Sequence, residues 1–168
     1  SKGAELILAG QSILDDVQCL VLNSPSNVIF EGIKGKLNSN SSSWTYLQKE
    51  LPYQKFQLGD YLLNKFFGKH IPEDSRAQID VSKISSPLLL LGSDVDEIWN
   101  ASSAIDDIIS HYKGESILFK KYHETGHMLT VAYQPNHRYR KDWRLLMKES
   151  VDSWFATISF FDTHLKNL

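Results

Sequence analysis

The stretch PLLLLG occupies residues 87–92 and carries the strongest strand signal in the chain. Four consecutive leucines leave no polar face, which is typical of a central strand buried on both sides in a parallel sheet. A carboxylate-rich segment, SDVDE, follows directly at residues 93–97. In open α/β sheets, ligands and catalytic groups gather at the carboxyl ends of the strands. The stretch therefore predicts the centre of a sheet and the edge at which a site should lie.

Strand and helix patterns alternate on both sides of this stretch. Short apolar runs at residues 17–22 and 117–122 predict two further interior strands. Helices are predicted over residues 2–13, 101–112 and 143–165. The first helix is apolar on nearly every side, which predicts burial within the domain. The last is expected to pack through one apolar face, made by Met147, Val151, Trp154, Phe155, Ile158, Phe161 and Leu165. The alternation predicts the α/β class, with a parallel sheet flanked by helices.

The segment between the first two strands, at about 24–80, has a different composition. Its serine-rich part, residues 34–43, is too polar to bury and is predicted to be a loop. Aromatic residues follow, and a helix is predicted over residues 58–67, ended by Gly68. We expect a cap-like insertion packed over the site, with a surface insertion held by aromatic contacts as the alternative. Residues 1–168 are treated as a single domain.

Composition limits the classes of function. A chain of 168 residues with 42% hydrophobic content can bury a core, and a formal charge of -2 gives no basic field for nucleic acid or an anionic membrane. The single Cys19 cannot form an internal disulfide, and no cluster has zinc-ligand spacing, so no metal or cofactor is expected. No apolar run is long enough for a membrane span, and no secretion signal opens the chain. We expect a cytoplasmic protein that acts on a small molecule.

Residue types suited to nucleophilic catalysis fall at the start of the chain and at two strand ends. Ser1-Lys2-Gly3 runs into the first helix and matches the back half of Gly-x-Ser-x-Gly, the sharp strand-to-helix turn that exposes a serine. Serine needs an imidazole base, which in turn needs a carboxylate to fix its tautomer. His127 and a carboxylate, Asp94 or Asp96, follow neighbouring strands. The order Ser, Asp, His is that of α/β-hydrolases.

Each of these residues also has a plainer interpretation. A serine at residue 1 can cap a helix, either aspartate can be a solvated carboxylate, and a histidine after glycine is often structural. His123 is the nearest rival of His127, but Gly126 allows the close backbone approach that a catalytic loop needs. A mechanism with the Ser1 amine as base is disfavoured, because such enzymes start on a strand and this chain starts on a helix.

A series of motifs along nearly the whole chain resembles one known family. They are SKGAEL (1–6), SNVIFEGI (26–33), SSWTY (42–46), LPY (51–53), ISSPLLL (84–90), DEIW (96–99) and YHETGH (122–127). Together they resemble the C-terminal catalytic domain shared by acyl-CoA thioesterases and bile acid-CoA:amino acid N-acyltransferase, with bacterial members most similar. The resemblance implies an α/β-hydrolase fold and cleavage of an acyl-CoA thioester through an acyl-enzyme intermediate. Ser1 would be the nucleophile, His127 the base and then the acid, and Asp96 the orienting carboxylate.

The chain departs from the family pattern in two ways. In the family, the aspartate usually stands three residues after the glycine that ends the strand. In this chain that position, three residues after Gly92, is occupied by Val95. Asp96 keeps the Asp-x-x-Trp spacing to Trp99 and is therefore chosen, with Asp94 as the alternative. Family enzymes also carry earlier strands and an N-terminal β-sandwich, so we expect this chain to be the C-terminal part, starting at the nucleophile elbow. The Lys2 N–H would be one oxyanion donor and the second would come from an earlier strand. A lost donor costs on the order of a hundredfold in rate, so the isolated fragment is expected to be a poor enzyme or inactive.

Several expectations about substrate and partners follow. Serine in place of the cysteine of the amino-acid transferases favours hydrolysis by water. The basic run at residues 137–141, with Arg144, is interpreted as a solvated helix entrance rather than a phosphate site. The alternatives are a carboxylesterase or dienelactone-type hydrolase of the same fold, and a non-catalytic degenerate domain. No nucleic-acid or membrane partner is expected, and a homo-oligomer is left open because exposed sheet edges favour self-association.

Overall fold

The computed structural model describes residues 1–34, 37–56, 59, 74–129 and 143–165. The elements in chain order are α1 (Lys2–Leu14), β1 (Leu20–Asn23), β2 (Glu31–Lys34), β3 (Leu37–Ser42), β4 (Thr45–Tyr46), β5 (Lys49–Glu50), β6 (Leu88–Ser93), α3 (Ala101–His111), β7 (Ile117–Tyr122) and α4 (Trp143–Leu165). Two short 3-10 turns, Ser75–Ala77 and Val81–Lys83, precede β6. The helix predicted at 58–67, apart from Gly59, and the basic run at 137–141 lie outside the described residues.

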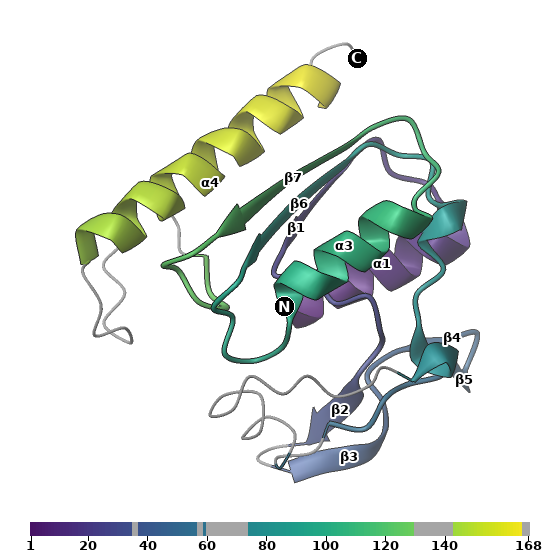
Figure 1. The fold of residues 1–168 in the computed structure, drawn as a ribbon. Coiled ribbons are helices and arrows are strands. Elements are labelled where there is room, and N and C mark those ends of the chain that lie inside the picture. The colour runs from purple at the N-terminus through teal and green to yellow at the C-terminus, as the bar shows by residue number, and fades with distance from the viewer. Residues whose placement is uncertain (35–36, 57–58, 60–73, 130–142, 166–168) are drawn as a thin grey trace.

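A parallel sheet with the strand order β1-β6-β7 forms the centre of the molecule (Figure 1). Leu88 pairs with Leu20 on one side and with Ile117 on the other. Every residue of β6 is buried, so the prediction of a central strand from the leucine run is confirmed. β1 begins at Leu20 rather than at residue 17, because the backbone N–H groups of Asp16 and Val17 donate to the Gln11 side chain instead of to a neighbouring strand.

Helices cover both faces of this sheet, α1 and α3 on one side and α4 on the other (Figure 1). Successive side chains of a strand point to opposite faces, and the leucines of β6 divide accordingly. Leu88 and Leu90 belong to the core cluster shared with α1 and α3, whereas Leu89 and Leu91 pack in the cluster that contains Phe160 of α4. The chain therefore has the α/β fold, with a parallel sheet between helical layers, that the sequence predicts.

The buried faces of α1 and α4 differ from the prediction. α1 is buried on one side, which includes Leu8, whereas four of its large apolar residues are exposed: Leu6, Ile7, Ile13 and Leu14. In α4 the face toward the sheet is made by Leu146, Ser150, Ser153 and Phe160. The predicted apolar stripe is mostly exposed, including Trp154, Phe155, Ile158, Phe161 and Leu165. Two small serines let this helix approach the sheet, so the face richest in apolar residues is not the face that packs.

The serine-rich segment is also not a loop, because β2 and β3 pair in an antiparallel hairpin. Its polar groups are satisfied locally: the Glu31 carboxylate accepts from the Asn40 N–H at 2.8 Å, and the Ser39 hydroxyl donates to the Ser41 carbonyl at 3.1 Å. A strand of this kind needs backbone pairing rather than apolar side chains. The β2–β3 and β4–β5 hairpins lie on the α1 and α3 side of the sheet, away from α4 (Figure 1).

No helix within the described ranges is both long enough and apolar enough to cross a membrane.

Candidate active site

A buried Asp–His pair lies at the carboxyl end of the sheet. Asp96 follows β6, and its carboxylate accepts from the backbone N–H groups of Ile98 and Trp99, at 2.9 and 3.2 Å, which fixes the turn. Its two oxygens lie 3.1 and 2.9 Å from Nδ1 of His127, in the loop after β7. The Asp96 side chain is 1% exposed and that of His127 11% exposed. A carboxylate at Nδ1 holds the proton there and leaves Nε2 as the ring atom that can accept one.

Asp94 pairs with a different histidine. Its carboxylate lies 2.8 Å from Nδ1 of His123, and both side chains are much more open to solvent, at 38% and 71% exposure. Each aspartate of the loop after β6 thus pairs with one histidine of the loop after β7, Asp94 with His123 and Asp96 with His127. The geometry favours Asp96 over Asp94 as the orienting carboxylate, because only the Asp96 pair is shielded from water.

Ser1 lies at the same edge of the sheet, as the residue before α1. Its backbone nitrogen donates to the Asn23 carbonyl at 2.9 Å and also to the Ser24 carbonyl, at the end of β1. Between these described residues, no hydrogen bond joins the Ser1 hydroxyl to the His127 ring. The nucleophilic role of Ser1 therefore stays a prediction.

Ser24 connects the parts of this site, and the sequence analysis missed it. The residue is fully buried with a φ of 46°, and its N–H donates to the Leu91 carbonyl at 2.7 Å. Its hydroxyl donates to the His127 carbonyl at 2.6 Å, and its own carbonyl accepts from Trp99 Nε1 at 3.3 Å as well as from Ser1. The available signal was a small polar residue between a strand and Pro25, a typical turn composition.

A second missed residue, Glu149 of α4, holds the loop that carries His127. Its carboxylate accepts from the N–H groups of His123, Glu124 and Thr125, at 2.9, 3.1 and 2.7 Å, and from the Thr125 hydroxyl at 2.8 Å. Burial raises the pKa of Glu149, but these hydrogen bonds outweigh it, and the pKa lies below its usual value. The histidine loop is thereby tied to a helix on the far face of the sheet.

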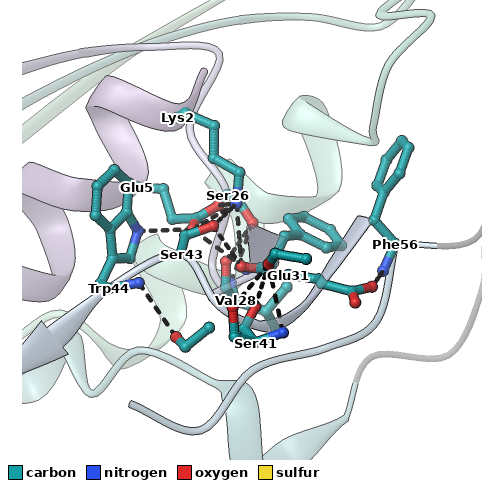
Figure 2. Close-up of polar contacts among 12 residues, drawn as sticks. Lys2, Glu5, Ser26, Val28, Glu31, Ser41, Ser43, Trp44 and Phe56 are labelled. Atoms are coloured by element: carbon teal, nitrogen blue, oxygen red, sulfur yellow. Dashed lines mark hydrogen bonds and ion pairs between the residues drawn. The ribbon is translucent and has the colours of Figure 1, made fainter. Parts of the chain in front are cut away.

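A largely buried ionic network ties the first turn of α1 to the segment between β1 and β6 (Figure 2). Lys2 Nζ lies 3.0 Å from the Glu5 carboxylate and donates to the Ser43 hydroxyl at 2.6 Å and the Phe30 carbonyl at 3.1 Å. Trp44 Nε1 donates to the same carboxylate at 2.8 Å. Burial lowers the pKa of Lys2 and raises that of Glu5, and each partner opposes the shift of the other. The residue after the predicted nucleophile is therefore held in place by its side chain.

The Asp96–His127 pair offers acid–base chemistry, and the N-terminus of α1 beside Ser1 offers backbone N–H groups with a positive dipole end, which favour a developing negative charge. Within the part of the chain that the structure describes, no group of three or more His, Cys, Asp or Glu side chains is arranged to hold a metal ion.

The sequence matches the model of a known protein family. The family described as "BAAT / Acyl-CoA thioester hydrolase C terminal" matches residues 1–167, nearly the entire chain. No curated protein matches the sequence.

Proposed function

The chain belongs to the BAAT/acyl-CoA thioester hydrolase C-terminal family, and on that premise we propose that it hydrolyses acyl-CoA thioesters with Ser1, His127 and Asp96 as its catalytic residues. The family has acyl-CoA thioesters as its substrates; the serine mechanism and the choice of water as acceptor are the proposal. The single observation that supports it best is the shielded hydrogen bond between His127 Nδ1 and the Asp96 carboxylate.

In the first half of the reaction, the Ser1 hydroxyl attacks the thioester carbonyl carbon, and His127 Nε2 takes the hydroxyl proton. Asp96 stays ionised and stabilises the imidazolium that forms. The oxyanion of the tetrahedral intermediate develops near the first turn of α1, where the Lys2 N–H would donate to it. The C–S bond then breaks, the thiolate of coenzyme A takes the proton from His127, and the acyl group remains on Ser1 as an ester.

In the second half, a water molecule replaces coenzyme A. His127 takes a proton from that water as it attacks the acyl-enzyme carbonyl, and then returns the proton to the Ser1 oxygen as the ester bond breaks. The products are the carboxylic acid and the free enzyme. A serine ester in place of a cysteine thioester favours water as the acceptor over an amino acid.

The test measures thiol release from a panel of acyl-CoAs by the purified full-length protein, beside hydrolysis of p-nitrophenyl esters. We expect a higher kcat/KM for the acyl-CoAs and loss of activity in a folded Ser1→Ala variant. A preference for the simple esters would favour a carboxylesterase of the same fold. Failure of an active-site fluorophosphonate to label the wild-type protein would favour a non-catalytic domain.

A further inference from the structure

We propose that three aromatic side chains, Trp99, Phe30 and Phe56, form the wall along which the acyl chain of the substrate lies. We call this set the aromatic row. The inference rests on the proposed function, because it states which part of the acyl-CoA thioester, the acyl chain, binds on the side of the site that the aromatic row occupies. It assigns acyl-chain selection to the first part of the insertion.

The row starts at the candidate base and leads away from it. The Trp99 ring lies edge-on to the His127 ring, with centroids 4.6 Å apart. Phe30 stacks on Trp99 at 5.5 Å with an interplanar angle of 17°, and Phe56 meets Phe30 edge-on at 6.0 Å. All three residues of the row are half-buried, so each retains exposed surface. The three rings thus form an unbroken series of contacts that starts beside the His127 ring.

The polar atoms of the row are already used within the protein. Trp99 Nε1 donates to the Ser24 carbonyl. The Phe30 N–H donates to Glu5, and its carbonyl accepts from Lys2 and Ser43. What these residues still offer to a ligand is ring surface.

The same holds for Phe56, whose N–H donates to the Glu31 carboxylate and whose carbonyl accepts from the Asn38 side chain. The ammonium group of Lys2 lies 5.6 Å from the Phe30 centroid and is paired with Glu5. The pantetheine arm of coenzyme A carries amides that need hydrogen-bond partners when they are buried. An acyl chain needs only apolar contact, which makes it the better match.

The experiment compares acetyl-CoA, hexanoyl-CoA and dodecanoyl-CoA as substrates of the full-length wild-type protein and its Phe56→Ala variant. A buried methylene contributes about 0.8 kcal/mol, and only a long chain extends as far as Phe56. We expect the ratio of kcat/KM for dodecanoyl-CoA to that for acetyl-CoA to fall on the order of tenfold. A Phe56→Leu variant, which keeps apolar volume, should lose less. Phe155→Ala, at an exposed phenylalanine of α4, is the matched control and should keep the wild-type ratio.

Thioesters of N-acetylcysteamine separate the two halves of the substrate. If the acyl chain lies on the row, the Phe56→Ala effect persists with this short thiol. An effect that vanishes with it, or that is equal for all chain lengths, would overturn the inference while leaving the proposed hydrolysis intact. If the wild-type protein cleaves no thioester, the proposed function fails, and calorimetric binding of dodecanoate decides: the inference requires weaker binding by Phe56→Ala, and equal binding overturns it.

Discussion

Replacing Glu149 with glutamine tests whether the histidine loop is positioned from α4. One carboxylate oxygen of Glu149 accepts from Thr125 N–H and hydroxyl at 2.7 and 2.8 Å, and the other accepts from His123 N–H at 2.9 Å. Glutamine keeps one acceptor oxygen but replaces the other by an NH₂ group, which cannot accept a hydrogen bond from the N–H groups that the second carboxylate oxygen binds. Each donor left unpaired in a buried site costs about 1–3 kcal/mol. Because Glu149 is only half-buried, water can satisfy some of the unpaired donors, and we expect the free energy of unfolding to fall by about 1–2 kcal/mol.

The expected consequence is kinetic as well as structural. A histidine displaced by a fraction of an ångström transfers protons poorly, so kcat should fall about tenfold while KM changes little. A tenfold fall in kcat corresponds to a rise of about 1.4 kcal/mol in the activation free energy. The assay is steady-state thiol release with melting curves of the same samples. Glu50→Gln, at an exposed position on β5, is the control. A Glu149→Gln variant that is less stable but retains the wild-type kcat would refute the reasoning.

The pH dependence of stability gives an independent reading of the same contact. The pKa of Glu149 is lowered in the folded protein. The carboxylate therefore stabilises the fold above its unfolded pKa of about 4.3, and this contribution is lost as the pH falls through the lower folded value. The stability gap between wild type and Glu149→Gln should be constant above about pH 5 and should close in more acidic buffer.

Three further substitutions probe the site. Asp96→Asn should reduce kcat by roughly 10³ to 10⁴, as loss of the orienting carboxylate does in serine proteases, whereas the matched change Asp94→Asn should reduce it by less than about threefold; equal losses in thiol release would contradict the assignment. Glu5→Gln leaves the Lys2 ammonium, 33% exposed, without its anion and should lower the free energy of unfolding, measured by chemical denaturation, by about 1–3 kcal/mol. An unchanged free energy of unfolding would mean that water stabilises the Lys2 ammonium as well as Glu5 does. Ser24→Ala removes the hydroxyl bonded to the histidine carbonyl and should cost about 1 kcal/mol in the same assay; an unchanged midpoint would contradict this.

The sheet was predictable because its signal is local. A run of four leucines needs burial on both faces, and β6 supplies it through α1, α3 and α4. The packed face of α4 was not predictable in this way, since periodicity reports which side of a helix is more apolar but not how close the sheet comes. Ser150 and Ser153 allow an approach that the apolar stripe would block. The β2–β3 hairpin was missed for a related reason, because strand pairing at an edge needs no apolar side chains.

The residues of the candidate site also differ in how far the sequence predicts them. Asp96 and His127 were identifiable from their places after consecutive parallel strands, whose ends meet at one edge. Glu149 and Ser24 were not. Glu149 belongs to no local pattern that points to the loop 24 to 26 residues before it, and the turn composition around Ser24 does not indicate a contact with His127, 103 residues away. The acyl-enzyme chemistry itself remains a proposal, and the family match supports the substrate class rather than the nucleophile.

The most direct test of the proposed mechanism is to trap the acyl-enzyme and locate it. The full-length protein is mixed with excess dodecanoyl-CoA, quenched in acid within the first turnovers, digested and analysed by mass spectrometry. The mechanism predicts a dodecanoyl ester on Ser1, absent from Ser1→Ala and formed far more slowly in a His127→Asn variant. An acyl group on another residue, or undiminished thiol release by Ser1→Ala, would contradict it.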